Sequence, residues 1–334
     1  MVDRPALINR GIHLEEIVVG KLEASGVSRM SSLRFVLERS GIAYYVDDRR
    51  LIVTTKEIAR AKWVSQLPKP QTKLLQGDDV DQRREVAFAA GVWRLDSDEW
   101  VKPLSGALAD ADRQVRFDAA YALGEFGPEA SIAIEPLSQL LRSDDLTLRE
   151  IATFALGKIG PSCCKELLEL INDPDPAIAV AAAKAFTVMG SAGNDAVPGL
   201  LAAGVKYANL NSAYDKYERC NVCDALGSAI AQVELGDALP QLKELLDSDS
   251  ANTRAFAAYA IGEIGPSGQK CKPDLERLLF DSNTLVRRNA AYAMARLDLP
   301  ADTPTTALEA AAKDLDRNVK LWATSALQKI RSKK

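Results

Sequence analysis

The 334-residue sequence predicts a mainly α protein, a right-handed α-α superhelix of about eight helical hairpins preceded by a small α/β domain. Three observations support this prediction. A motif of 13 residues recurs at nearly constant spacing over most of the chain. Aromatic residues make up 6% of the chain and apolar residues 47%, which favours closely packed helices over a β-sandwich. Residues 1–60 lack the repeat and alternate between strand-like and helix-like segments.

The N-terminal segment is expected to hold three strands and one helix. Residues 18–23 have the composition of a strand, and residues 29–39 place apolar side chains at helical spacing before Gly41. Residues 43–46 and 51–55 are rich in β-branched and aromatic side chains and flank a polar turn. The predicted order is therefore β-α-β-β.

Three stretches of this segment resemble the short N-terminal domain of secretins and TonB-linked receptors. They read Ser-Leu-Arg-Phe-Val-Leu, Gly-Ile-Ala-Tyr-Tyr-Val and Leu-Ile-Val-Thr-Thr, and the resemblance covers residues 12–57. It implies a small domain over residues 1–60 that mediates protein contacts. Residues 61–79 are expected to form a linker or capping helix, and residues 80–334 the helical array.

The repeated motif begins at an arginine that we call the anchor. From Arg116 it reads Arg-Phe-Asp-Ala-Ala-Tyr-Ala-Leu-Gly-Glu-Phe-Gly-Pro, and close copies begin at Arg149 and Arg254. Degenerate copies begin at Arg83, Ala179, Arg219, Arg287 and Lys320. The intervals between these anchors are 33, 33, 30, 40, 35, 33 and 33 residues. A period this regular predicts stacked structural repeats.

Each period is expected to form two helices. The first is short and amphipathic and carries a proline in its first turn, as at Pro103 and Pro240. A polar turn such as 110–112, 143–145, 173–175 or 247–249 then caps the second helix, which carries the anchor and a strip of alanine and glycine. Gly-Pro pairs end the second helix.

The motif Val/Leu-Arg-x-x-Ala-Ala-x-Ala-Leu-Gly-x-Ile-Gly resembles HEAT repeats, specifically the short type found in phycobilisome (PBS) lyase proteins. The resemblance covers about 71–331 and implies a HEAT-like α-solenoid. Two departures stand out, since Ala179 replaces the anchor arginine and residues 206–217 form an insertion. We expect the insertion to lengthen a helix or loop on one face of the array.

The anchor arginines form a ladder of one residue per repeat, at Arg83, Arg116, Arg149, Arg219, Arg254 and Arg287. Such a ladder suggests nucleic-acid binding at first sight. We expect instead a structural role, in which each arginine pairs with acidic turn residues such as Asp112 and Asp145 along the stack.

The resemblance implies that four positions of each second helix face a concave groove. Residues at these positions combine aromatic rings with charges, a composition typical of protein-binding hot spots. The alternative is that the rings pack on their own neighbours inside the stack. The candidate partner-binding residues are Phe88, Phe117, Tyr121, Phe154, Phe256, Tyr259, Tyr292, Trp322, Glu125, Lys158, Glu263, Arg288 and Arg296.

Catalytic and metal chemistry finds little support in the sequence. His13 is the single histidine, which excludes metal sites with several histidines, and it has no recognisable catalytic partner. Cys220 and Cys223 have CxxC spacing but lie in an expected helix, so we interpret them as buried apolar residues. No metal, no cofactor and no catalytic residue is predicted.

Charge and hydropathy restrict partners and location. Residues 1–70 carry 12 basic and 8 acidic side chains, which leaves residues 71–334 with a net charge of −8. An acidic array disfavours nucleic acid as a partner. We also expect no membrane span and no signal peptide, and the five cysteines favour a cytoplasmic location in a reducing compartment. Export directed by an upstream signal that has been lost from this sequence is the alternative.

The sequence therefore predicts a soluble, non-catalytic protein-interaction scaffold that binds a partner protein on the concave face of the solenoid. A homo-oligomer is left open. The alternative is a bilin lyase-like or chromophore-protein handling factor, implied by the PBS-lyase type of repeat.

Overall fold

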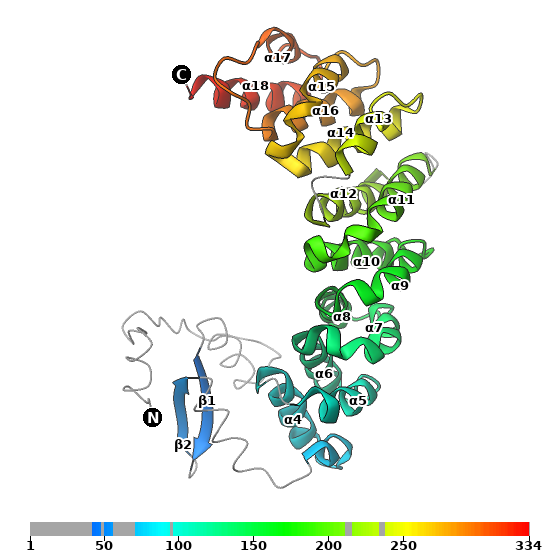
Figure 1. Cartoon of the computed structure of the whole chain (residues 1–334), viewed down its shortest axis with the longest axis vertical. Coiled ribbons are helices and arrows are strands. Elements are labelled where there is room, and N and C mark those ends of the chain that lie inside the picture. The colour runs from blue at the N-terminus through cyan, green and yellow to red at the C-terminus, as the bar shows by residue number, and fades with distance from the viewer. Residues whose placement is uncertain are drawn as a thin grey trace. The chain divides into compact units, whose positions relative to one another are not determined.

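The computed structural model describes residues 42–47, 50–55, 71–93, 96–210, 216–233 and 238–333 (Figure 1). The chain divides into two compact units, Met1–Gly77 and Asp78–Lys334.

The first unit contains an antiparallel hairpin. Strand β1 (Ile42–Asp47) pairs with β2 (Arg50–Thr55), and Tyr44 lies opposite Val53 in the register. These strands overlap the predicted segments 43–46 and 51–55. A 3-10 helix, η2 (Gln71–Gln76), follows. The other predicted elements of the β-α-β-β order, and His13, lie outside the described residues, so the secretin-like domain stays a prediction.

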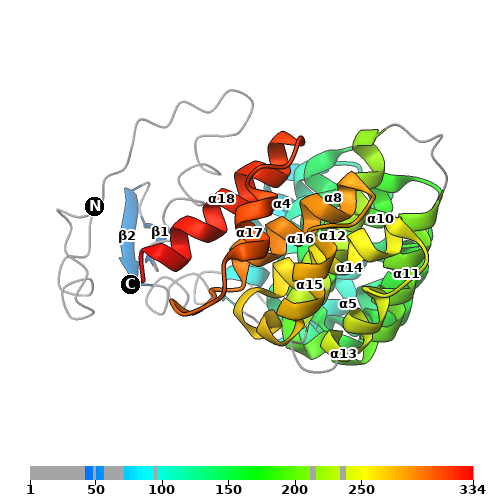
Figure 2. The same cartoon turned by 90° about the horizontal axis from the view of Figure 1, so that it is seen from above.

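The second unit is an array of helical hairpins in two layers (Figures 1 and 2). The helices that carry the repeated motif, called anchor helices below, pack successively against one another. They are α4 (Val80–Trp93), α6 (Arg113–Phe126), α8 (Leu146–Ile159), α10 (Pro176–Met189), α12 (Lys216–Val233), α14 (Ala251–Ile264), α16 (Thr284–Arg296) and α18 (Arg317–Arg331).

A shorter helix precedes and packs against each anchor helix from α6 onward. These first helices are α5 (Ser97–Ala107), α7 (Ile134–Leu141), α9 (Cys164–Leu170), α11 (Val197–Asn209), α13 (Ala238–Leu245), α15 (Lys272–Leu278) and α17 (Thr306–Ala311). The sequence predicted about eight hairpins, and the described residues form seven. The first anchor helix, α4, is preceded there by the 3-10 helix η2 and not by an α-helix.

Local rules set the helix boundaries. Asp112, Asp145 and Asp175 cap α6, α8 and α10 through side-chain bonds to backbone N–H groups, as predicted. Two expectations were wrong in detail. Ser250, rather than a residue of 247–249, caps α14, and Pro103 lies well inside α5, because Asp96 starts that helix earlier.

The ends of four anchor helices follow the predicted Gly-Pro rule or a close variant of it. Gly127, Gly160, Gly190 and Gly265 have φ values between 61° and 85°, which glycine adopts without steric cost. Each lies at or next to the start of a 3-10 turn that leads to the next hairpin: η3 (Gly127–Ala133), η4 (Pro161–Cys163), η5 (Gly190–Ala196) and η6 (Gly265–Cys271).

The core lies between the two layers and between neighbouring anchor helices. Ala119, Ala120 and Ala122 of α6 are fully buried, which confirms the small-residue strip. Leu104 and Leu137 of the first helices fill the space between layers, and burying such a side chain stabilises the fold by about 1.5–3 kcal/mol. No hairpin buries these faces without its neighbours, so stacking holds the array together.

The insertion lengthens two helices, as predicted. Helix α11 has 13 residues and α12 has 18, against 8 in α7 and 14 in α8. The longer α11 extends to α14, where Asn209 Nδ2 donates to Thr253 Oγ1 at 2.9 Å and Ser250 Oγ donates to Asn209 Oδ1 at 2.5 Å. Tyr207 Oη donates to the Ile171 carbonyl at 2.7 Å on the preceding side.

We expected no segment with the composition of a membrane span, but one segment of the described residues has it. Residues Pro176–Asn209 are long and apolar enough by composition. The structure divides this stretch at Gly190 into α10 and α11, which form part of the array, and half of the tested window is buried there.

Candidate protein-interaction surface

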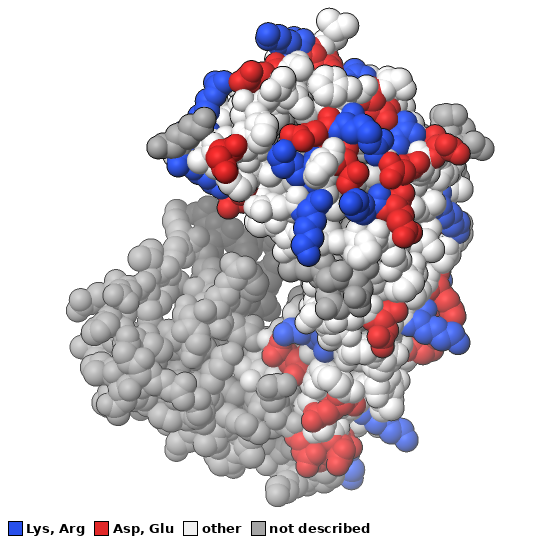
Figure 3. Space-filling view, turned by 45° about the horizontal axis from the view of Figure 1, so that its top comes forward, with Lys and Arg blue, Asp and Glu red and all other residues white. Residues whose placement is uncertain are grey.

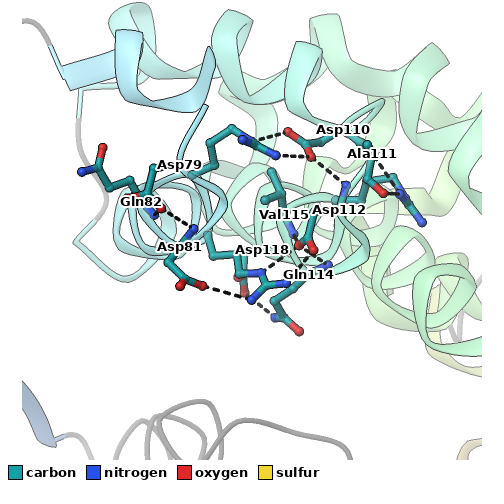
Figure 4. A network of polar contacts seen from close by, with 12 residues as sticks. Asp79, Asp81, Gln82, Asp110, Ala111, Asp112, Gln114, Val115 and Asp118 are labelled. Atoms are coloured by element: carbon teal, nitrogen blue, oxygen red, sulfur yellow. Dashed lines mark hydrogen bonds and ion pairs between the residues drawn. The ribbon is translucent and has the colours of Figure 1, made fainter. Parts of the chain in front are cut away.

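The anchor arginines tie neighbouring turns together. Arg83 donates through Nε and Nη2 to Asp110 of the next repeat, at 2.8 and 3.2 Å, and through Nη1 to the Asp78 carbonyl at 3.2 Å. Figure 4 shows Asp110 and Asp112 in the network of polar contacts at this turn. Arg254 and Arg287 repeat this arrangement with Asp281 and Asp314, with closest distances of 2.9 and 2.8 Å. The guanidinium groups are largely buried and therefore point to a structural role.

Not every anchor forms an ion pair. Arg116 and Arg149 donate to the backbone carbonyls of Asp110 and Ser143, in their own turns. Arg83 pairs with Asp110, and the position that corresponds to Asp110 in the next repeat is occupied by Ser143. Arg116 therefore finds no carboxylate at that position. The side chain of Arg219 lies outside the described residues.

The acidic partners named from the sequence were wrong. Asp112 pairs with Arg84 at 2.6 Å, and Asp145 pairs with Arg113. These aspartates are N-caps, two residues beyond the position that faces the anchor. The hydrogen bond from Arg84 lowers the pKa of Asp112 to about 2.

Aromatic rings of the anchor helices form two stacked groups. Five of the six rings lie five residues after an anchor, a position that we call the third-position row, and Trp322 lies two residues after the anchor Lys320. Phe88, Tyr121 and Phe154 stack with centroid distances of 6.3 and 6.2 Å. Tyr259 and Tyr292 stack at 5.5 Å, and Trp322 meets Tyr292 edge-on at 5.1 Å. All six are half-buried, so each ring packs on its neighbours and also reaches the surface.

A glycine of the preceding repeat makes room for three of these rings. A Cβ atom built on Gly124 would lie 2.9 Å from the Phe154 ring, and one on Gly262 would lie 2.8 Å from the Tyr292 ring. Gly227 stands in the same relation to Tyr259, also at 2.8 Å. The Ala-Leu-Gly part of the motif therefore seats the ring of the following repeat.

The third-position row is interrupted in the middle of the array by Lys184 and Asp224. Two hollows lie at the interruption. One has a volume of about 260 Å³ and is lined by Asp224, Tyr259, Tyr292 and Trp322, among others. The other has a volume of about 870 Å³ and is lined by Glu150, Lys184 and again Asp224, among others. Asp224 therefore borders both hollows.

A polar cluster surrounds the second ring group. Glu263 accepts hydrogen bonds from Tyr292 Oη and, at 3.2 Å, from Ser228 Oγ. Arg296 lies over the Tyr292 ring, 5.5 Å from its centroid, and donates to the Gly262 carbonyl at 2.9 Å. Burial, followed by the hydrogen bond to Glu263, raises the pKa of Tyr292, so this hydroxyl stays protonated and donates.

The other predicted partner-binding residues have mixed outcomes. Phe256 was expected to face the groove but is only 4% exposed, because the lengthened α11 covers it and Gly204 lies against its ring. Arg288 pairs with Asp316. Lys158 is exposed and lies over the Phe154 ring at 5.8 Å. Phe117 and Glu125 are half-buried on α6.

Asp224 is the residue that the sequence-based set omitted. It is not aromatic and does not belong to the repeated motif. The one signal in the sequence is that Asp224, like Lys184, stands at a position of the third-position row where most repeats have an aromatic residue. Desolvation, followed by the negative charge of Glu263, raises its pKa to about 6.

The described cysteines do not form a metal or redox centre. Burial raises the pKa of the Cys163 thiol to about 12 and raises that of Cys271 as well. Cys223 lines the smaller hollow, and the side chain of Cys220 lies outside the described residues. No group of three or more possible metal-ligating side chains occurs in the part of the chain that the structure describes.

Comparison with protein families decides the classification. The family model for HEAT repeats matches residues 68–145, 134–206 and 239–328, which together cover more than half of the chain. The chain belongs to the HEAT-repeat family. No curated protein matches it.

Solved HEAT-repeat structures share the fold of this chain. The karyopherin Kap121p bound to the SUMO protease Ulp1p has a TM-score of 0.56 at 13% identity, over 90% of this chain and 37% of that one. Kap121p bound to Pho4p has a TM-score of 0.54 at 12% identity, over 91% and 38%. This HEAT-repeat chain thus spans well under half the length of these karyopherins, and the likeness shows the fold alone.

Proposed function

We propose that this HEAT-repeat protein is a non-catalytic scaffold that binds a partner protein along its anchor-helix layer, which we take as the concave face. The observation that carries the proposal is the pair of half-exposed ring groups, together with two surface hollows, the smaller of which is lined by the second ring group. Rings seated on glycine and stacked on one another lose little side-chain entropy when a partner binds. Two structures of Kap121p, which share the fold, contain a bound protein, Pho4p or Ulp1p, and this supports a protein-binding role.

Four rings are expected to carry most of the affinity: Tyr121, Phe154, Tyr259 and Tyr292. Replacing all four with leucine should sharply reduce capture of partner proteins from an extract of the source cells, measured by quantitative mass spectrometry. Leucine keeps an apolar side chain over each glycine, and circular dichroism would confirm that the helices persist. Phe280→Leu is the matched control, because Phe280 is 63% exposed and lies outside the ring groups. Unchanged capture by the fourfold variant would contradict the proposal.

Nucleic acid is a poor alternative partner. Residues 71–334 carry a net charge of −8, and Lys and Arg are interspersed with Asp and Glu on the face drawn in Figure 3. A gel shift at low salt should show no complex with duplex DNA or RNA.

The finer predictions from the sequence belong to this proposal. The PBS-lyase type of repeat suggests chromophore handling as the alternative function, and incubation with a bilin and a phycobiliprotein subunit should give no new absorbance band. The secretin-like segment would add a second protein-contact surface. We propose a cytoplasmic location for both parts, in line with the reduced cysteines expected from the sequence.

A further inference from the structure

Among the described residues, Tyr259 stacks on one ring, that of Tyr292 in the following repeat, and on no ring of the preceding repeat. Phe154 lies on Gly124 and stacks on Tyr121, the ring one repeat earlier. Tyr259 lies on Gly227 in the same way, but the residue one repeat earlier is Asp224. A short carboxylate thus stands where the repeat pattern places an aromatic ring.

The smaller hollow opens at this position. Its lining residues include Asp224, the half-buried Tyr259, Tyr292 and Trp322, and Phe256, which is only 4% exposed. Its volume of about 260 Å³ holds a long side chain, since a water molecule takes about 30 Å³. Aromatic walls combined with a carboxylate suit a cation that carries methylene groups, because the rings pack on the methylenes and attract the charge.

The charged side chains that line the smaller hollow are Asp224 and Arg288, and Arg288 is paired elsewhere. Asp224 has no ion pair among the described residues. Arg288, which also lines the hollow, is neutralised by Asp316, and Arg296 lies beside Glu263 at 4.0 Å. Desolvation, followed by repulsion from Glu263, raises the pKa of Asp224.

The larger hollow indicates that the ligand is a segment of chain. It lies on the other side of Asp224 and has a volume of about 870 Å³. Besides Asp224, its charged lining residues are Glu150, Asp175, Lys184 and Arg149, and Arg149 donates to the Ser143 carbonyl of its own turn. A peptide that places one side chain in the smaller hollow would continue into the larger one, whereas a small free cation would leave it empty.

We propose that the smaller hollow binds one lysine or arginine side chain of a basic segment of the partner protein. The cation pairs with the Asp224 carboxylate, and its methylene groups pack against Tyr259 and Trp322. This inference rests on the proposed scaffold function, because it assigns the chemistry of the partner that the same helix layer binds.

The test uses fluorescence anisotropy with the full chain and defined peptides. The first probe is a fluorescein-labelled Gly-Ser peptide with a lysine at every third position. Two control peptides of the same length carry norleucine or glutamate in place of each lysine. Norleucine keeps the methylenes and removes the charge, so it should weaken binding about tenfold, and glutamate should abolish binding.

The matched variants are Asp224→Asn and Asp302→Asn. The first removes the charge at the site without changing the shape of the side chain, and Asp302 is an exposed carboxylate outside the anchor helices. Asp224→Asn should weaken binding of the lysine peptide about five- to tenfold and leave binding of the norleucine peptide unchanged. Asp302→Asn should leave both unchanged.

Several results would overturn the inference. They are equal binding of the lysine and norleucine peptides, no effect of Asp224→Asn, no binding of the lysine peptide at about 1 mM, or equally tight competition by N-acetyl-lysine amide, which would indicate a small-cation site. If the fourfold leucine variant loses partner capture while Asp224→Asn binds normally, this inference fails and the scaffold function stands. Normal capture by the fourfold variant contradicts the scaffold function itself.

Discussion

Gly262 offers a direct test of how the repeats fit together. It lies in α14, where this helix packs against α16, and we expect Gly262→Ala to destabilise the array. The added Cβ would lie 2.8 and 2.9 Å from two atoms of the Tyr292 ring and 3.0 Å from the Ala293 Cα atom. The ring can move by a small rotation, but the backbone atom belongs to the facing helix. The two helices must therefore separate.

The expected magnitude follows from two opposing terms. Overpacking of a well-filled interface costs about 1–3 kcal/mol. Alanine is favoured over glycine within a helix by about 1 kcal/mol, which offsets part of that cost. We therefore expect a net loss of about 1 kcal/mol in the free energy of unfolding. Because repeats interact mainly with their nearest neighbours, the loss should be concentrated at α14 and α16.

Gly106→Ala is the matched control for this test. Gly106 lies in the last turn of α5, is exposed, and has no atom within 4 Å of its built Cβ. The same chemical change should therefore leave stability unchanged or raise it by about 0.5 kcal/mol. Urea unfolding followed by circular dichroism gives the two free energies, and amide hydrogen exchange locates the loss. Equal or greater stability of Gly262→Ala than of the wild-type protein would refute the close-packing argument.

Three further outcomes are expected. Arg254→Met should lower the unfolding free energy by about 2 kcal/mol because it leaves a largely buried aspartate unpaired, whereas Arg331→Met at an exposed pair should cost under about 0.5 kcal/mol in the same urea titration. The pKa of Asp112 is about 2, below its ordinary value of 3.8, so its stabilising contribution is present above about pH 4 and is lost as the pH falls toward 2. Asp112→Asn should therefore reduce the loss of unfolding free energy between pH 4 and pH 2. An unchanged dependence of the unfolding free energy on pH would contradict this. The pKa of Asp224 is about 6, so binding of the lysine peptide should strengthen between pH 5 and pH 7.5 in anisotropy titrations, and Asp224→Asn should remove that dependence. The other charged or titratable groups lining the hollows are Cys223, Tyr259, Arg288 and Tyr292 in the smaller one and Arg149, Glu150, Asp175 and Lys184 in the larger one. Glu263 and Arg296 lie in the adjoining polar cluster.

Much of the fold follows from local rules that can be recognised in the sequence. An aspartate that caps a helix and a glycine that ends one act on backbone groups within a few residues. Asp112, Asp145 and Gly127 were therefore predictable from their neighbours alone. The repeat period predicts the stacking of the hairpins, because a strip of alanine and glycine that recurs in every repeat can be buried only when the repeats stack.

Contacts between repeats were less predictable. The sequence indicated that anchor arginines meet acidic turn residues, but not that Arg83 meets Asp110 and Arg84 meets Asp112. These aspartates are two residues apart in the sequence. The choice between them depends on how far each helix is rotated against the next, which no local pattern reports.

The sequence by itself determined the repeat, its helix boundaries and the row of aromatic rings on one helix face, because periodicity and capping act along the chain. Only the tertiary structure decided which of those residues form a surface. The lengthened α11 buries Phe256, while the missing ring at Asp224 opens a hollow beside Tyr259. Exposure is set by what a neighbouring repeat places against a side chain, 35 residues away for Asp224 and Tyr259 and 52 for Gly204 and Phe256, so it emerges only when the repeats are stacked.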